Sequence, residues 1–250
     1  MIALITGATS GFGKACAELF ASNGYDIIIT GRRADRLEEL KRDLGQRSNV
    51  RVHTLTFDVR DKGAVFNAIE QLSAEWRPID VLVNNAGLAL GRDYFDEADM
   101  DDWDTMLDTN VKGLLYVSKA ALPLLKKSKA PHIINIGSTA GKEVYEKGNV
   151  YCASKYAVNA ISQGMRIDLL RLGIKVTMVS PGAAETEFSL VRFKGDEETA
   201  KSVYKGFKPL TAEDVAGVVY YCTTLPPHVC INDVVLTSTA QANSLYFHRT

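Results

Sequence analysis

The feature that most constrains the fold is a repeated alternation of short apolar runs with longer amphipathic runs along the whole chain. Runs such as Ile27-Ile-Ile29 and Val81-Leu-Val83 carry apolar side chains at consecutive positions, which is typical of strands buried on both faces. The strands are predicted at residues 3–6, 26–30, 50–57, 81–84, 132–136, 175–180 and 233–236. The helices are predicted at residues 13–22, 34–44, 62–74, 101–125, 151–172, 186–205 and 212–224.

Strands and helices in alternation indicate right-handed βαβ crossovers, which place parallel strands in one sheet. No linker, internal repeat or low-complexity stretch interrupts the series. The sequence therefore predicts an α/β fold with one domain over residues 1–250. We expect a doubly wound Rossmann domain whose parallel sheet has about seven strands, with helices on both faces.

The composition is that of an ordinary globular protein, with 46% hydrophobic and 24% charged residues. The formal net charge is -1 and no long run of one sign occurs, which argues against nucleic-acid or anionic-membrane partners. The 4 cysteines lack metal-ligand spacing, which favours free thiols in a reducing compartment and no metal site. Neither a leader nor an apolar stretch of about 18 residues is present, so we expect a cytoplasmic protein.

A glycine-rich stretch follows the first predicted strand and opens the first predicted helix. Glycines at this joint let the backbone turn tightly and approach a pyrophosphate, while free amides at the helix N-terminus face its negative charge. The glycine spacing is Gly-x3-Gly-x-Gly, and its place in a βαβ unit favours phosphate binding over a plain turn. The loop residues predicted to bind a dinucleotide are Gly7, Thr9, Ser10, Gly11, Phe12 and Gly13.

The end of the second strand indicates which dinucleotide is bound. An NAD site usually carries an acidic residue about 20 residues beyond the glycines, to accept from the ribose 2′-hydroxyl. Here the strand ends in Gly31-Arg32-Arg33, and the next carboxylate is Asp35. Guanidinium groups suit a 2′-phosphate, whereas positive charge is unfavourable at a helix N-terminus, where these arginines otherwise lie. The sequence therefore predicts NADP rather than NAD.

Asp58 and Val59 end the third predicted strand, and two interpretations of this pair stay open. They can contact the adenine, through a hydrogen bond from Asp58 and packing on Val59. Asp58 can equally cap the helix that begins near Lys62.

Two Tyr-x3-Lys pairs occur, Tyr151/Lys155 and Tyr204/Lys208, and on a helix each pair lies on one face. Tyr151 opens the helix after a buried strand, where open α/β sheets place their ligands. The second pair straddles Gly206, a helix-ending signal, and follows an acidic segment, so we expect it at an exposed helix end.

Several short motifs follow one another along the chain: Thr6-Gly7-x3-Gly11-x-Gly13, Asn84-Asn85-Ala86-Gly87, Asn110, Ser138, Tyr151-x3-Lys155 and Pro181-Gly182. With these motifs in this order, the sequence resembles the short-chain dehydrogenase/reductase family over essentially its whole length. Residues 84–91, 132–141 and, most distinctively, 186–196 carry a closer similarity. Through them the sequence is, within that family, most similar to the bacterial NADP-dependent 3-hydroxy acid dehydrogenases, also called serine or allo-threonine dehydrogenases.

The resemblance implies a role for each of four catalytic residues. Tyr151 is the general acid/base, and Ser138 holds the substrate oxygen. Lys155 binds the nicotinamide ribose and lowers the pKa of Tyr151. An ammonium about 4 Å away at an effective dielectric near 20 interacts by about 4 kcal/mol, which amounts to a lowering of about 3 pKa units. Asn110 supports a proton-relay water behind Lys155.

The resemblance also implies cofactor contacts at two further strand ends. The segment after the fourth strand lines the ribose, and the segment after the sixth reaches the nicotinamide carboxamide and the pyrophosphate. These residues are Asn85, Ala86, Gly87, Pro181, Gly182 and Thr186, and the catalytic Tyr151 and Lys155 contact the cofactor as well.

The segment at about 188–208 takes the place of the family's substrate-covering loop. It contains Arg192 and Lys194, and either can pair with a substrate carboxylate or belong to an ordinary charged surface. Of the two, Arg192 is the predicted substrate contact, together with Ser138 and Tyr151.

Three functions agree with these observations to different degrees. The first is NADP-dependent oxidation of a small 3-hydroxy acid of the serine, allo-threonine or 3-hydroxypropionate type, or the reverse semialdehyde reduction. The second is a broader carbonyl or 3-oxoacyl reductase of the same family. The third is a non-enzymatic dinucleotide sensor, against which the four intact catalytic residues argue. Apolar side chains on more than one face of the helices predicted at 101–125 and 151–172 imply, by the same resemblance, a homotetramer.

Overall fold

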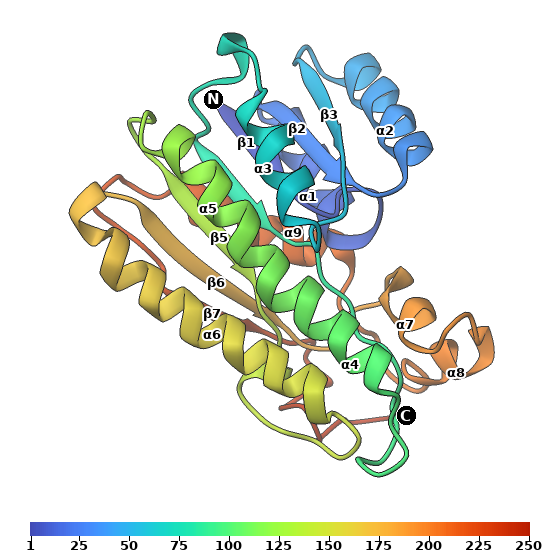
Figure 1. Ribbon diagram of the computed structural model, residues 1–250. Coiled ribbons are helices and arrows are strands. Elements are labelled where there is room, and N and C mark those ends of the chain that lie inside the picture. Colours follow the sequence, from blue (N-terminus) through green and yellow to red (C-terminus); the bar gives the residue numbers. More distant parts are fainter.

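The computed structural model describes all residues, 1–250, and contains one sheet of seven parallel strands in the order β3-β2-β1-β4-β5-β6-β7 (Figure 1). The chain enters at β1 in the middle of the sheet, winds outward to β3, and then returns past β1 to build β4–β7 on the other side. This double winding confirms the predicted Rossmann fold. The strands are β1 (Ile2–Ile5), β2 (Asp26–Gly31), β3 (Val52–Thr56), β4 (Val81–Asn84), β5 (His132–Ile136), β6 (Lys175–Pro181) and β7 (Asp233–Leu236).

Helices cover both faces of the sheet, as the doubly apolar strands require (Figure 1). One face carries α1 (Gly11–Ser22), α2 (Ala34–Arg47) and α9 (Ala212–Thr224). The other carries α3 (Lys62–Glu70), α5 (Leu114–Leu125) and α6 (Asn149–Leu169). The helix α4 (Met100–Leu107) precedes α5, and the short α7 (Glu187–Arg192) and α8 (Glu197–Ser202) lie apart from the sheet. None of these helices is long and apolar enough to cross a bilayer.

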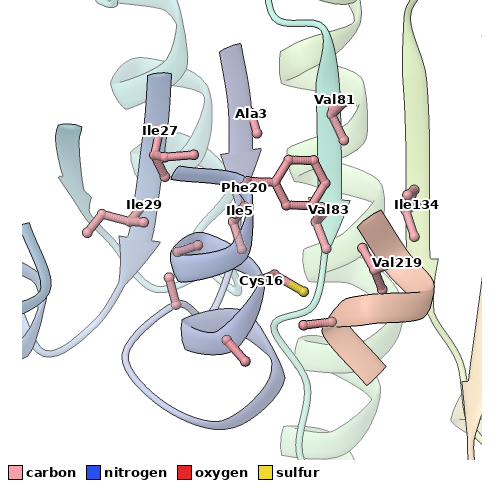
Figure 2. Packing of buried hydrophobic residues seen from close by; sticks show 14 of the residues in the cluster. Ala3, Ile5, Cys16, Phe20, Ile27, Ile29, Val81, Val83, Ile134 and Val219 are labelled. Atoms are coloured by element: carbon pink, nitrogen blue, oxygen red, sulfur yellow. The ribbon is translucent and has the colours of Figure 1, made fainter. Parts of the chain in front are cut away.

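The core on the α1 side shows how the strand pattern is used. Phe20 and Cys16 of α1 point onto the central strands and lie beside Ile5, Val83 and Val219, all of them fully buried (Figure 2). Each Å² of apolar surface buried on folding stabilises the folded state by about 25 cal/mol, so such contacts contribute most of the stability of the fold. This packing fixes the strand ends that carry the polar loops.

Two of the predicted helices differ from a regular α-helix. The predicted helix at 101–125 is continuous but contains a π-helical turn at Asp108–Gly113 between α4 and α5. The prediction of one helix over 186–205 is wrong, because α7 ends at a left-handed turn in which Lys194 has φ 52° and Gly195 has φ 95°. Asp196 then caps α8 by accepting from the Thr199 amide. Glycine followed by aspartate is an end-and-restart signal that the apolar periodicity hides.

His132 is the first residue of β5 and lies buried at the edge of the sheet opposite the polar loops. The Thr177 hydroxyl donates to the Ile231 carbonyl (2.6 Å), so His132 Nε2 donates to Thr177 Oγ1 (2.7 Å) and Nδ1 has no partner. Burial, with a smaller effect of Lys175, lowers the pKa of His132 from 6.5 to about 3. Between pH 6.5 and about pH 3, His132 is therefore neutral in the folded protein and protonated in the unfolded chain.

This histidine predicts a loss of stability in mild acid. Below pH 6.5 the unfolded state binds a proton that the folded state does not, so stability falls with decreasing pH towards about 3. At 1.36 kcal/mol per pH unit, the loss from His132 between pH 6.5 and pH 5 is about 2 kcal/mol. Urea unfolding at both pH values measures the free energy of unfolding. We expect His132→Gln to lose about 2 kcal/mol less than the wild type between pH 6.5 and pH 5. The exposed control His228→Gln is expected to lose as much as the wild type. Equal pH dependence in the two variants would contradict the assignment.

Candidate active site

The C-terminal ends of the strands surround a cavity of about 740 Å³. Every predicted cofactor residue except Gly13 lines it, and so do Ser138, Tyr151, Lys155 and Arg192. Asn110 lies just behind the cavity wall. The geometry therefore brings together residues from widely separated segments of the chain, at the edge where open α/β sheets bind ligands.

The glycine loop forms one wall of the cavity. Gly7 and Gly11 have φ values of 64° and 53°, which only glycine adopts without strain, and α1 starts at Gly11. A Cβ on Gly13 would collide with the Gly7 carbonyl and the Asn85 side chain, so Gly13 permits close packing of the loop rather than lining the cavity. The loop thus leaves the N-terminal amides of α1 open towards the cavity.

The segment after β4 holds this loop in place. Thr6 Oγ1 accepts from the amides of Asn85 (3.0 Å) and Ala86 (2.9 Å), and Asn85 Nδ2 donates to the Thr6 and Gly7 carbonyls. Asn84, by contrast, is buried within the sheet, where its side chain donates to Ser118 and Asn135. Asn84 therefore has only internal partners, whereas Asn85, Ala86 and Gly87 line the cavity.

Tyr151 and Lys155 lie one turn apart on the first part of α6, and both are buried. Lys155 Nζ donates to the Ile136 carbonyl at the end of β5 (3.0 Å), which fixes the ammonium beneath the cavity. Ser138 follows β5 and accepts from the Ala140 amide through Oγ (3.1 Å). The Phe188 ring of α7 covers Tyr151 with 5.8 Å between ring centroids.

The pKa of Tyr151 does not show the expected lowering by Lys155. Burial raises the pKa of Tyr151, and the nearby Ser138 hydroxyl and Arg192 guanidinium lower it only in part. Lys155 Nζ lies 6.0 Å from the centre of the Tyr151 ring, and burial lowers the pKa of Lys155 to about 8. Desolvation therefore outweighs the attraction between the two groups, which sequence spacing alone cannot show.

Asn110 lies in the π-helical turn and is held by its side chain. Its Oδ1 accepts from the Leu88 amide (2.8 Å), and its Nδ2 donates to the Leu88 carbonyl (2.8 Å) and Ser154 Oγ (3.0 Å). These bonds tie the loop after β4 to α6, close to Lys155. The π-turn brings this side chain inward, and such turns are frequent at functional sites.

The two arginines after β2 lie at the far end of the cavity. Arg33 donates to Thr9 Oγ1 (2.7 and 3.2 Å) and Ser10 Oγ (3.1 Å) of the glycine loop. Arg32 is largely exposed, with only a loose ion pair of 3.7 Å to Asp58. Both guanidiniums line this end of the cavity.

Asp58 also lines the cavity, beside Val59. Its carboxylate accepts from the backbone amide (3.0 Å) and the guanidinium of Arg60. Burial raises the pKa of Asp58, but these bonds outweigh burial and the pKa is lowered. The cap of α3 is Asp61, which accepts from the Ala64 amide (2.9 Å). The interpretation of Asp58 as a helix cap is therefore wrong, and its place at the cavity favours the alternative, an adenine contact.

Arg192, on α7, lies next to the predicted acid/base. Its guanidinium carbon is 5.5 Å from the centre of the Tyr151 ring, with Nε donating to the Gly91 carbonyl (3.3 Å) and NH1 to the Tyr145 hydroxyl (3.0 Å). Lys194 points elsewhere and pairs with Asp102 (2.9 Å). Of the two basic residues considered in this segment, only Arg192 faces the cavity.

Tyr204 is not at an exposed helix end, as its sequence context had suggested. Its hydroxyl donates to the Ala184 carbonyl (2.8 Å) and is 2.6 Å from Ser189 Oγ, so it joins α7 to the segment after β6. Lys208 is exposed and takes no part. The second pair therefore lacks an ammonium beside its phenol, and Tyr204 is structural.

Sequence reasoning missed several residues of the cavity. Tyr145 holds Arg192, and Gln241 accepts from the Ala183 amide through Oε1 (2.8 Å) against Gly182. The chain end also reaches the cavity, through Leu245, Phe247 and Arg249. No motif marks these residues, because their positions depend on loops that return from distant parts of the chain. No group of three or more His, Cys, Asp or Glu side chains is arranged to hold a metal ion.

Comparison with known proteins agrees with this geometry. The chain is 48% identical over 246 residues to sulfoacetaldehyde reductase 2 of Chromohalobacter salexigens, covering 98% of this chain and 97% of that protein. It is 45% identical over 251 residues to the NADP-dependent 3-hydroxy acid dehydrogenase of Escherichia coli (strain K12), covering 100% of both. The closed form of serine dehydrogenase complexed with NADP+ superposes with a TM-score of 0.92 at 46% identity, over 100% of both chains. The family model for the short chain dehydrogenases matches residues 1–196, and this chain belongs to that family.

Proposed function

We propose that the protein is an NADP-dependent oxidoreductase that moves a hydride between the nicotinamide and the hydroxyl-bearing carbon of a small 3-hydroxy acid, or reduces the corresponding semialdehyde. The observation that carries the proposal is one cavity with an acid/base group and a guanidinium at one end and two arginines at the other. Tyr151 and Arg192 lie at the first end, and Arg32 and Arg33 lie at the second.

The residues present fit NADP. The glycine loop leaves room for a pyrophosphate, since Gly7 and Gly11 have backbone conformations that exclude other side chains. The end of β2 offers guanidiniums and no carboxylate, which suits a 2′-phosphate better than a 2′-hydroxyl. The names of the similar Escherichia coli dehydrogenase and of the similar serine dehydrogenase structure both specify this cofactor.

The mechanism assigns each polar group one task. Bound NADP supplies the hydride acceptor. Tyr151 takes the substrate hydroxyl proton, and Ser138 Oγ holds the oxygen on which negative charge develops. Lys155, buried and hydrogen-bonded to the end of β5, would hold the nicotinamide ribose and pass the proton on towards Asn110. The Phe188 ring on α7 keeps water away from Tyr151.

Arg192 is the group that recognises the substrate acid. Two of its nitrogens are held by Gly91 and Tyr145, and the remaining NH2 group is free to donate. A carboxylate on the substrate can pair with this fixed guanidinium while its hydroxyl reaches Tyr151. The enzyme names of the relatives describe substrates that all carry an acidic group.

We expect Arg192→Ala to raise KM for hydroxy acids by about 10- to 100-fold, because a charged hydrogen bond of about 1.5–3 kcal/mol is lost. KM for uncharged alcohols is expected to change little. Steady-state kinetics with 3-hydroxypropionate and 1-propanol measure the difference, with Lys194→Ala as a control that removes an equal charge from the same segment. Equal effects of Arg192→Ala on both substrates would remove Arg192 from this role.

A second candidate substrate is a small sulfonated aldehyde. The 48% identity to a sulfoacetaldehyde reductase favours it, and a guanidinium binds a sulfonate through the same donors as a carboxylate. Broader carbonyl or 3-oxoacyl reduction is less well supported, because an acid-binding arginine beside the acid/base has no use for a neutral substrate. A non-enzymatic sensor has no use for Ser138, Tyr151 and Lys155 together.

A substrate panel tests the proposed function. Each compound is supplied with NADP or NAD, and the panel comprises 3-hydroxypropionate, L-serine, 2-hydroxyethanesulfonate and 1-propanol. We expect the compounds that carry a carboxylate or sulfonate to exceed 1-propanol in kcat/KM by at least about 100-fold, and the rates with NADP to exceed those with NAD. Equal rates with charged and neutral alcohols would support the broader reductase, and no turnover with any carbonyl or alcohol would support the sensor.

We further propose that the protein is a cytoplasmic homotetramer. Apolar side chains remain exposed on the helices on one side of the molecule, among them Ile167 and Leu170, each 76% exposed at the end of α6. A face of this kind is usually covered by another subunit. Analytical ultracentrifugation is expected to give four times the mass of one chain, and a concentration-independent monomer would contradict the proposal.

A further inference from the structure

Glu187, the first residue of α7, links this helix to the start of α2. Its carboxylate accepts from Arg33 NH1 (3.2 Å) and from Arg36 NH1 (2.7 and 3.0 Å). Glu187 and Arg33 both line the cavity, whereas Arg36 lies outside it. A carboxylate from α7 thus lies on an arginine that the proposed function assigns to the cofactor phosphate.

The hydrogen-bonding capacity of Arg33 is almost fully used. A guanidinium has five N–H donors. Nε and NH2 donate three bonds to Thr9 and Ser10, and NH1 donates one to Glu187. NH1 is thus the only guanidinium nitrogen that makes no bond to the glycine loop, and it is the nitrogen from which Glu187 accepts. A phosphate that approaches this free end of Arg33 therefore competes with the Glu187 carboxylate for NH1.

The bond from Arg33 to Glu187 is the one most easily exchanged. It is a single contact of 3.2 Å between groups that are about 40% exposed, whereas Arg36 holds both carboxylate oxygens at 3.0 Å or less. If the Arg33 bond is given up, the carboxylate keeps a complete partner in Arg36. The carboxylate is also a like charge for a phosphate at Arg33, so moving it towards Arg36 relieves repulsion.

We propose that Glu187 is a specificity-determining residue for the cofactor: it occupies the Arg33 donor that the 2′-phosphate of NADP requires, and Arg36 retains the carboxylate when the phosphate binds. This inference rests on the proposed use of NADP. It makes Arg36 a positioning residue, which favours NADP binding by drawing Glu187 away from Arg33 without touching the cofactor.

The test measures cofactor affinity by titration calorimetry without substrate, at about 50 mM salt so that exposed charges are not strongly screened. We expect Glu187→Gln to tighten NADP binding about three- to fivefold, in the range of exposed ion pairs, and to leave NAD binding unchanged. Glu185→Gln is the matched control. It removes the same charge two residues away, from an exposed side chain with no ion pair, and is expected to change neither affinity by more than about 1.5-fold.

Arg36→Ala tests whether Arg36 draws Glu187 away from Arg33. In the wild-type background we expect it to weaken NADP binding about threefold, because Glu187 then pairs with Arg33 alone. In the Glu187→Gln background we expect Arg36→Ala to have no effect. An equal weakening in both backgrounds would mean that Arg36 binds the phosphate directly and would overturn the inference. So would a Glu187→Gln affinity equal to that of Glu185→Gln, or an equal change for NADP and NAD.

The wild-type affinities separate this inference from the proposed function. If the wild-type protein binds NAD as tightly as NADP, the proposed cofactor preference fails, whatever the variants show. If it prefers NADP and Glu187→Gln changes nothing, the proposed function stands and only the role of Glu187 is wrong.

Discussion

Replacing Tyr151 with phenylalanine is expected to lower kcat by at least about 10⁴-fold, the upper end of what a single acid/base group contributes. The phenol lies in the cavity together with Ser138 and Lys155, and the variant keeps the ring that packs against Phe188. NADP binding is expected to change little, because the variant removes one hydroxyl from an extended site. The loss should therefore appear in kcat and not in the cofactor Kd.

Single-turnover kinetics and a fluorescence titration with NADPH measure these two quantities. Tyr204→Phe is the matched control, since it removes a phenol from the same cavity that has structural partners only, in Ser189 and Ala184. We expect it to retain kcat within about tenfold, in keeping with one lost neutral hydrogen bond of about 1 kcal/mol. A Tyr151→Phe variant that keeps a tenth or more of the wild-type kcat would show that another group moves the proton.

Replacing both Arg32 and Arg33 with alanine is expected to weaken NADP binding by about 3 kcal/mol or more, roughly 150-fold, while changing NAD binding little. Each charged hydrogen bond to a phosphate is worth about 1.5–3 kcal/mol, and NAD has no phosphate at this position. Arg33 also donates to Thr9 and Ser10 of the glycine loop, so we expect a small loss of NAD affinity as well.

Titration calorimetry with both cofactors gives the ratio of affinities directly. The control is Arg42→Ala with Arg47→Ala, which removes two exposed arginines from α2, outside the cavity. This variant carries the same change of net charge, so it reports any general electrostatic effect. If the wild-type protein uses NAD as well as NADP, or if both variants weaken NADP equally, the arginines after β2 do not read the phosphate.

Much of the fold follows from local sequence features. Each predicted strand overlaps an observed one, because the buried parallel strands are mostly short apolar runs that stand out from amphipathic helices. The glycine loop and the Tyr151/Lys155 pair were also readable, since both depend on residue types that a turn or a helix face requires within a few positions. These features are local, so the sequence carries them directly.

The remaining features depend on contacts between distant segments. Arg192 faces Tyr151 because Tyr145 and Gly91 hold it, and neither carries a recognisable signal. The raised pKa of Tyr151 results from burial by parts of the chain that sequence spacing does not describe. Gly195 and Asp196 mark the break between α7 and α8, but the amphipathic pattern continues across them and hides it.

The central claim is that this cavity transfers hydride from a small hydroxy acid to NADP, with Tyr151 taking the proton. The most direct test uses 3-hydroxypropionate carrying deuterium on its hydroxyl-bearing carbon and follows the mass of the cofactor. We predict that the wild-type protein transfers one deuterium to NADP per turnover and that Tyr151→Phe transfers none in the same time. Unlabelled reduced cofactor, equal labelling by Tyr151→Phe, or labelling of NAD as fast as of NADP would contradict the account.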